Sequence, residues 1–387
     1  MARFVTTEKL NELFDWLENL GLDVLYIRDS EDHRDVNLKY LTGHPEDASL
    51  FIDVQNRQTV LIPWDYQLSN NYSEVDQVIN IMEYDGGLIP ATFETLKSIV
   101  NSNPKIGVPK SIPYFYVRTI IDQIPNAEII YNPQEIDTKL DQLRSTKSPH
   151  EISLLKKSVS ISNQLVEEME ELMNRHSPNN IETEVDLAIF VENRMRELGA
   201  FGTGFETLVA SSKRSWQIHT YPRADQLSMY RPGLALIDFG VNAEGLTSDV
   251  TLPFIIGKMN NKMKVIVETV EHAHNEAIDN LREVNFLHEV AEVAMRIIES
   301  KKFKMPHGLG HGIGLTVHDS PDLRKKPTHE ILLKNWTDTR LEEGMVFTIE
   351  PGIYEKDVGG FRLENDVIIT SKGPQVITNS HPIFIDL

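Results

Sequence analysis

The chain has 387 residues, 25% of them charged and 40% hydrophobic, which is usual for a globular enzyme that buries a sizeable core. Its 58 acidic and 38 basic residues give a formal charge of -20, which argues against nucleic-acid binding because phosphate recognition needs clustered Lys and Arg. Cysteine is absent, so disulfides, thiolate nucleophiles and cysteine-bound metals are excluded, and any metal must be held by His, Asp and Glu.

Residues 1–143 are predicted to form one α/β domain. An apolar stripe over residues 6–20, followed by Gly21, predicts a helix that ends at that glycine. The segments LDVLYI, ASLFIDV and TVLIP predict strands, VINIMEY continues their alternation, and IGV and EIIY are short buried strands. The N-terminus lacks the apolar core of a signal peptide and no run approaches 18 apolar residues, so a cytoplasmic protein with no membrane partner is expected.

A second domain, residues 144–387, is expected to follow the segment RSTKSPHEISLLKK. Ser148 and Glu151 form a capping-box pattern around Pro149, which predicts a helix over residues 149–175. Further helices are expected over 182–198, 261–281 and 287–301, interleaved with hairpins from about residue 200 onward. The fold class is therefore α/β, or α+β, in two domains.

The stretch PHGLGHGIGLTVHDSP, residues 306–321, places histidines among glycines. His307 and His311 would share one face of a helix, but each glycine between and after them costs roughly 1 kcal/mol in a helix interior. With period two, the stretch instead predicts an extended strand whose bare face lets another group approach its backbone. One of these histidines is expected to be a metal ligand or an acid/base group.

Two predicted hairpins each carry a pair of carboxylates. Asp238 and Asp249 would face each other if the first hairpin folded about residues 243 and 244. Glu350 and Glu364 flank EKDVGG, whose adjacent glycines are expected to supply the second turn. Like charges that face each other on apolar strands need a cation between them or a proton on one of them.

Together with His311, these four carboxylates make an oxygen-rich set with a single nitrogen. Two divalent cations would balance the four negative charges, and the donor types suit Mn, Co, Fe or Zn. Two such ions can share a bridging water and lower its pKa toward neutrality, which produces a hydrolytic nucleophile.

Five segments in this order resemble the pita-bread metallopeptidases of the M24 family, in the branch of Xaa-Pro aminopeptidases and prolidases. They are GFETLVASSKRSWQIHTYP, IDFGVNAEGLTSDVTLPF, HGLGHGIGLTVHDSP, TIEPGIY and GFRLENDV. The resemblance covers about residues 146–387, and the preceding part is similar to the creatinase/prolidase-type N-terminal domain of that branch. It implies a pita-bread catalytic domain after that N-terminal domain.

The resemblance also implies roles for individual residues. His318 would assist proton transfer and stabilise the tetrahedral intermediate, His219 would contact the substrate near the scissile bond, and Arg362 would bind near the substrate and form an ion pair that orients Glu364. Glu350 would also act as the general base. The implied metal ligands are Asp238, Asp249, His311, Glu350 and Glu364.

The function implied is hydrolysis of the Xaa-Pro bond, either at the N-terminus of peptides or in Xaa-Pro dipeptides, by a homodimer that holds two divalent ions, with Mn or Co favoured over Zn or Fe. The run of residues 322–344 is longer than in small prolidases and leaves substrate length open. Arg324, Lys325 and Lys326 could hold a terminal carboxylate, or they could form a solvated basic loop. Two alternatives are a catalytically silent peptide-binding module on the same fold and a metal-independent hydrolase of creatinase type.

Overall fold

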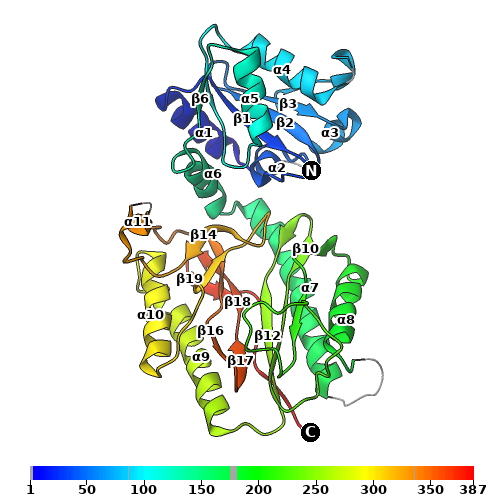
Figure 1. The fold of residues 1–387 in the computed structure, drawn as a ribbon, viewed down its shortest axis with the longest axis vertical. Coiled ribbons are helices and arrows are strands. Elements are labelled where there is room, and N and C mark those ends of the chain that lie inside the picture. Colours follow the sequence, from blue (N-terminus) through cyan, green and yellow to red (C-terminus); the bar gives the residue numbers. More distant parts are fainter. Residues whose placement is uncertain (1–2, 86, 175–180, 335) are drawn as a thin grey trace. The chain divides into compact units, whose positions relative to one another are not determined.

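The computed structural model describes residues 3–85, 87–174, 181–334 and 336–387, which belong to two compact units, Met1–Arg144 and Ser145–Leu387 (Figure 1). Each unit has its own sheets and its own apolar core. Within the described ranges, no helix is both long enough and apolar enough to cross a lipid bilayer.

The first unit contains one mixed sheet with the strand order β4-β3-β2-β1-β5-β6. The three central strands β1, β2 and β3 pair antiparallel, whereas β4, β5 and β6 add parallel to their neighbours. The strands are β1 Val24–Asp29, β2 Ala48–Asp53, β3 Gln58–Pro63, β4 Gln77–Val78, β5 Lys105–Gly107 and β6 Glu128–Ile130, and the helices are α1 Thr7–Asn19, α2 Val36–Thr42, α3 Tyr66–Tyr72, α4 Leu88–Ile99, α5 Tyr114–Gln123 and α6 Ile136–Ser145.

Helix α1 forms where its apolar stripe predicts it. The side chain of Thr6 accepts a hydrogen bond from the N–H of Lys9, which caps the first turn. At the other end Gly21 has a φ of 74°, a left-handed conformation that glycine adopts at little cost.

The prediction that VINIMEY continues as a strand was wrong. Strand β4 ends at Val78, and Ile81–Glu83 form a 3-10 helix. The side chain of Asn80 accepts a hydrogen bond from the N–H of Met82 at 3.1 Å, and such a local bond competes with strand pairing.

The second unit begins with the long helix α7, Pro149–Asn174. The predicted capping box is present, because the N–H of Ser148 donates to Oε2 of Glu151 at 2.8 Å and the N–H of Glu151 donates to Oγ of Ser148 at 3.2 Å. The remaining helices are α8 Glu184–Glu197, α9 Asn261–Asn280, α10 Leu287–Ser300 and the short α11 Glu330–Leu333.

Two larger sheets form the body of this unit, with the strand orders β20-β12-β9-β8 and β14-β13-β15-β18-β19. Two smaller sheets, β11-β10-β7 and β16-β17, complete it. The strands are β7 Gly202–Thr203, β8 Leu208–Ala210, β9 Gly233–Phe239, β10 Val241–Ala243, β11 Leu246–Thr247, β12 Val250–Ile256, β13 Gly310–Gly312, β14 Asp319–Leu323, β15 Val346–Ile349, β16 Gly352–Glu355, β17 Gly359–Arg362, β18 Asn365–Thr370, β19 Gly373–Val376 and β20 Ile383–Ile385.

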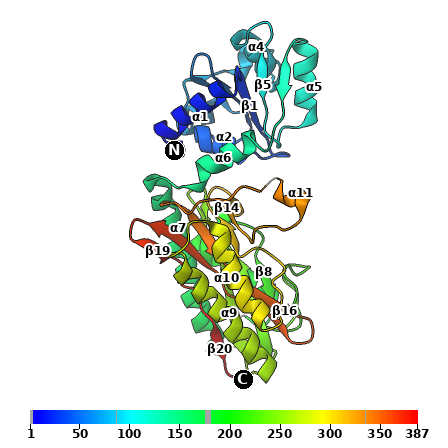
Figure 2. The ribbon, with the colours of Figure 1, turned by 90° about the vertical axis from the view of Figure 1, so that its left-hand side faces the viewer.

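Each large sheet is covered by a helix pair. Helices α7 and α8 pack on the β12-β9 sheet through a core that contains Leu165, Val191 and Ile237. Helices α9 and α10, which run side by side in Figure 2, pack on the β13-β15-β18 sheet through a core that contains Val270 and Phe347. The opposite sides of the two sheets are therefore left to carry polar side chains.

The glycine-rich stretch 306–321 is extended over a much shorter length than its alternation predicts, since β13 contains only three residues. The bare face is nevertheless used as expected. A Cβ atom on Gly310 would lie 2.0 Å from the carbonyl oxygen of Thr348, and one on Gly312 would lie 2.2 Å from that of Ser320. Neighbouring backbone fills the space that side chains would need.

Candidate active site

A cavity of about 420 Å³ lies in the second unit, and aspartate, glutamate, histidine and arginine side chains line it. Its walls come from strands β8, β9, β13, β14 and β17 and from loop segments next to the strands. Every predicted site residue lines it, namely His219, Asp238, Asp249, His311, His318, Glu350, Arg362 and Glu364.

The first pair of carboxylates comes from the β9–β12 ribbon, but the predicted register was wrong. Asp238 pairs with Thr251 rather than with Asp249. The turn lies at Glu244 and Gly245, whose φ angles are 55° and 83°, one residue later than predicted. Moving the turn by one residue changes the partner of each strand residue by two positions. Side chains alternate between the two faces of a strand with period two, so Asp249 stays on the same face as Thr251 and Asp238.

The second pair, Glu350 and Glu364, lies between two short ladders of identical register. Ile349 pairs with Asn365 on one side, and Gly352 pairs with Arg362 on the other, so the two glutamates come opposite each other. The adjacent glycines do not supply the turn as predicted. They begin β17, where a Cβ atom on Gly360 would lie 2.0 Å from the carbonyl oxygen of Ser215.

His311 presents one ring nitrogen to these carboxylates. Its Nδ1 lies 3.1 Å from the carbonyl oxygen of Gly312, an acceptor, so Nδ1 carries the proton and Nε2 carries the lone pair. That Nε2 lies 3.5 Å from Oδ2 of Asp249 and 3.7 Å from Oε1 of Glu350. Burial lowers the pKa of His311 to about 4, which keeps the ring neutral near pH 7 and able to act as a ligand.

Three of the side chains offer ligand atoms within 4.8 Å of one another: Asp249, His311 and Glu364. Burial, and after it the repulsion of neighbouring carboxylates, raises the pKa of Asp249 and Glu350 well above its usual range and that of Glu364 to about 7. Oδ1 of Asp238 and Oδ1 of Asp249 are buried without a hydrogen-bond partner among the described residues. Such a set fits divalent cations, which would satisfy these oxygens and offset the repulsion.

Arg362 is 2% exposed and makes its ion pair with Asp238, from Nη2 to Oδ2 at 2.5 Å. Its contact with Glu364 is indirect, which corrects the expected direct pair. Nε of Arg362 donates to Oγ1 of Thr251 at 2.8 Å, and that hydroxyl donates to Oε2 of Glu364 at 2.6 Å. One guanidinium group thereby orients carboxylates from both ribbons.

His307, the first histidine of the glycine-rich stretch, uses both of its ring nitrogens in hydrogen bonds. Nδ1 of His307 donates to the carbonyl oxygen of Gly308 at 2.7 Å, and its Nε2 accepts from the hydroxyl of Tyr354 at 3.0 Å. Both nitrogens are therefore engaged, which agrees with leaving His307 out of the predicted ligand set. Tyr354 in turn accepts from Nη1 of Arg362 at 2.9 Å.

Two residues of this network were missed in the sequence analysis. Tyr354 was overlooked because a tyrosine in a strand is ordinary. Asp366 is fully buried, and its Oδ2 accepts the N–H of Asp249 at 3.1 Å. The sequence could have indicated Asp366, because a residue two positions after Glu364 in an extended segment lies on the same face.

His219 and His318 line the same cavity. The rings of His318 and His311 meet edge to face, with centroids 4.3 Å apart. Burial, followed by the charges of Arg223 and Arg362, lowers the pKa of His219. Two arginines, Arg223 and Arg324, also line this space.

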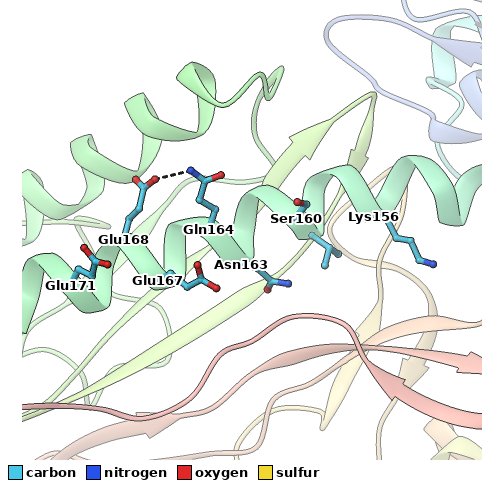
Figure 3. Close-up of a pocket in the computed structure, with 8 residues that line it drawn as sticks. Lys156, Ser160, Asn163, Gln164, Glu167, Glu168 and Glu171 are labelled. Carbon is cyan, nitrogen blue, oxygen red and sulfur yellow. Dashed lines mark hydrogen bonds between the residues drawn. The ribbon is translucent and has the colours of Figure 1, made fainter.

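A second hollow lies on α7 and differs in its chemistry (Figure 3). It is an open groove along one side of the helix, and three glutamates, Glu167, Glu168 and Glu171, are among the residues that line it. Glu168 accepts from Gln164 at 2.8 Å and from Nε of Arg194, also at 2.8 Å. Its eight described lining residues include neither a histidine nor an aspartate, so the cavity around His311 is the candidate active site.

Both units match known families. Residues 153–371 match Metallopeptidase family M24, and residues 9–145 match the Creatinase/Prolidase N-terminal domain. The chain belongs to metallopeptidase family M24. This M24 protein is a metallopeptidase with a creatinase-type N-terminal α/β domain followed by a pita-bread catalytic domain, and the crowded, partly unsatisfied carboxylates fit the divalent metal ions that the family implies.

Relatives of this M24 metallopeptidase span its full length. It is 27% identical over 379 residues to a Xaa-Pro dipeptidase of Pyrococcus horikoshii, a match that covers 97% of this chain and 98% of that protein. A Xaa-Pro dipeptidase of Pyrococcus furiosus is 26% identical over 377 residues, covering 96% of this chain and 98% of that one.

Solved structures also match nearly the whole chain. The prolidase from Pyrococcus horikoshii superposes with a TM-score of 0.79 at 25% identity, covering 97% of this chain and 99% of that one. The X-Pro aminopeptidase from Thermotoga maritima superposes with a TM-score of 0.77, also at 25% identity, covering 96% and 99%. The match extends over both units of this M24 metallopeptidase.

Proposed function

We propose that this metallopeptidase hydrolyses the bond between an N-terminal residue and a following proline, in dipeptides or at the start of longer peptides. The observation that carries the proposal is the convergence of four carboxylates and one lone-pair imidazole nitrogen on a single cavity. Support for proline specificity comes from relatives named Xaa-Pro dipeptidase and from similar structures of a prolidase and an X-Pro aminopeptidase. An Xaa-Pro bond is a tertiary amide without an N–H, which peptidases that grip an extended backbone fit poorly.

In this proposal Asp238, Asp249, His311, Glu350 and Glu364 hold two divalent metal ions, with Mn or Co favoured over Zn or Fe. When bound, the ions supply Lewis acidity, which lowers the pKa of a water molecule and polarises the substrate carbonyl. Glu350 accepts the proton of the attacking water, a role that suits a carboxylate whose pKa is raised by burial and by its neighbour Glu364.

The remaining residues act on the substrate or on the ligands. His219 and His318 donate hydrogen bonds to the charge that develops on the carbonyl oxygen, as in other oxyanion sites. Arg362 orients Asp238 through its contact at 2.5 Å. Water is held away from most of this arrangement, since Asp249, Arg362 and Glu364 are all buried.

The test is hydrolysis of Ala-Pro, Gly-Pro and Arg-Pro-Pro by manganese-loaded protein, with Ala-Ala as the control substrate. Cleavage of the dipeptides alone identifies a dipeptidase, and cleavage of the tripeptide identifies an aminopeptidase. Asp249→Asn is expected to abolish either activity, while Glu244→Gln, which alters an exposed contact with Lys157 at 2.8 Å, leaves it unchanged. A metal-bound protein that cleaves none of the proline substrates would refute the proposal and favour a silent peptide-binding module.

A metal-independent hydrolase of creatinase type predicts a different result. Activity would survive exhaustive chelation and would be retained by Asp249→Asn. The homodimer implied by the family is tested separately, by light scattering on the purified chain, and the assay of activity does not depend on it.

A further inference from the structure

A buried ion pair lies behind the wall of the active-site cavity. Nζ of Lys147 is 3.4 Å from Oδ2 of Asp319, and the two side chains are only 1% and 2% exposed. Neither residue lines the cavity. Withdrawing both charges from water is costly, and an apolar pair of similar volume often serves stability as well or better, so stability alone does not explain this pair.

The pair is attached to the residues that immediately follow His318. Asp319 is the next residue in the chain, and its Oδ1 accepts the N–H of Ser320 at 2.8 Å. Nζ of Lys147 also donates to the carbonyl oxygen of Ser320 at 3.5 Å. The ammonium group therefore contacts two consecutive residues at one end of the segment that carries His318.

The other end of that segment approaches the same two charges. An ideal Cβ atom on Gly314 would lie 2.7 Å from Oδ2 of Asp319 and 3.1 Å from Cε of Lys147. The N–H of Gly314 donates to the carbonyl oxygen of Thr316 at 3.2 Å, which closes a tight turn. Residues 314–320, which we name the His318 loop, thus fold around the ion pair, and Gly314 needs to be bare for the pair to fit.

Lys147 is itself held by backbone contacts next to strand β15. Its N–H donates to the carbonyl oxygen of Gly344 at 2.7 Å, and Thr146 forms a bridge with Met345 just before β15. Strand β15 also pairs with β13, the strand that carries His311. A lysine anchored on this framework can fix the distance between His318 and His311, whose ring centroids are 4.3 Å apart.

We propose that Lys147 is a positioning residue: its ammonium group, bound to Asp319 and Ser320, holds the His318 loop so that the His318 imidazole faces the reacting carbonyl. The inference rests on the proposed function, in which His318 donates to the charge that develops there. Lys147 touches neither substrate nor metal in this proposal and acts only through the loop.

Three changes release the anchor in different ways. Asp319→Asn removes the anion and keeps the side-chain shape, and Gly314→Ala forces a Cβ atom into the pair. Lys147→Met combined with Asp319→Asn removes both charges and leaves none unpaired, so this double variant is expected to fold even if a single one does not. The matched controls are Lys157→Met and Glu244→Gln, which break an exposed ion pair between a lysine and a carboxylate.

Each release variant is expected to lower kcat on Ala-Pro at least tenfold and to change KM less than twofold, because a hydrogen bond to developing charge contributes in the transition state rather than to substrate binding. In a His318→Ala background the same changes are expected to lower kcat less than twofold. An equal loss in both backgrounds, a change in KM alone, or a double variant with the kcat of the wild type would overturn the proposal.

A second readout separates this inference from the proposed function. In protein labelled on histidine, the ring protons of His318, assigned by their loss in His318→Ala, lie against the His311 ring and report their separation by chemical shift. The release variants are expected to shift these signals, and the control variants are not. If the wild type cleaves no Xaa-Pro substrate, the proposed function fails, yet the shift still decides whether Lys147 positions His318; unchanged signals would overturn the inference.

Discussion

The guanidinium group of Arg362 donates a hydrogen bond to Oδ2 of Asp238 at a distance of 2.5 Å. Oδ1 of the same carboxylate is buried and has no hydrogen-bond partner among the described residues. One oxygen is therefore fixed by the protein, and the other is the atom that we propose binds a cation. The same guanidinium contacts Thr251 and Tyr354, so three of its nitrogens are used at once.

This geometry predicts that Arg362→Lys is not conservative. Lysine keeps the charge, but one ammonium group cannot reproduce the planar set of contacts to Asp238, Thr251 and Tyr354. Loss of a residue that orients a ligand typically weakens metal affinity by about 10- to 100-fold, and that loss is expected in calorimetric titration with Mn²⁺. Arg194→Lys, at a partly exposed ion pair with Glu168, is the matched control. Unchanged affinity in Arg362→Lys would show that the orientation of Asp238 does not matter.

Removing the metal is expected to lower the thermal stability of the second unit. A ligand that binds only the folded state adds about 2.7 kcal/mol at a hundred times its Kd, so added Mn²⁺ raises the melting temperature of metal-free protein. Asp249→Asn removes one of the proposed ligands, next to His311, and is expected to cancel most of that rise. Differential scanning fluorimetry with and without Mn²⁺ measures it. An equal rise in the variant would place the bound ion elsewhere.

We predict that His44 makes the stability of the first unit depend on pH. Its ring is fully buried, and burial lowers the pKa of the imidazole to about 4, below the value of 6.5 in an unfolded chain. The unfolded state binds a proton below pH 6.5, whereas the folded state does not until about pH 4. This contribution to stability is therefore present above pH 6.5 and is lost as the pH falls from 6.5 to 4, by an amount on the order of 3 kcal/mol.

Hydrogen exchange read on peptides from residues 1–144 measures this loss. The free energy of opening of the wild type is expected to fall between pH 7 and pH 4.5 by more than that of His44→Gln, which has no imidazole to protonate. His33→Asn, at an exposed position of the same unit, is the control. Parallel pH profiles for wild type and His44→Gln would contradict the prediction.

Substrate length is predicted to depend on Arg324. It lines the cavity and donates to Oδ2 of Asp322 at 2.6 Å, but both side chains are more than half exposed. An exposed pair of this kind is worth only about 0–1 kcal/mol, so the carboxylate of a dipeptide can displace Asp322. Asp322→Asn is expected to raise kcat/KM for Ala-Pro relative to Ala-Pro amide, and Arg324→Gln to lower it. A ratio that neither variant changes would remove Arg324 from substrate binding.

Much of the local structure was predictable because it depends on neighbours in the chain. The capping box of Ser148 and Glu151 and the end of α1 at Gly21 formed where short-range patterns placed them. The pairing of Glu350 with Glu364 follows from strand register alone. In contrast, the 3-10 helix after Val78 depends on one side-chain hydrogen bond of Asn80, which periodicity does not reveal.

The register of Asp238 could not be fixed from the sequence, because NAEG admits turns that differ by one residue. The choice follows from Glu244 and Gly245, which both adopt positive φ angles, and a non-glycine residue rarely does so. The direct partner of Arg362 was equally hidden, since Asp238 lies 124 positions away in the chain. The assignment of individual ligands and catalytic groups therefore stays a prediction until metal binding is measured.

The close approach of backbone at Gly310 and Gly312 has a consequence for laboratory evolution. Carbonyl oxygens of Thr348 and Ser320 occupy the volume that any side chain at these two positions would need. Saturation mutagenesis of the two codons should therefore return active clones that encode glycine almost without exception. Substitutions that alter specificity are therefore expected to be tolerated around Arg324 and not at Gly310 or Gly312.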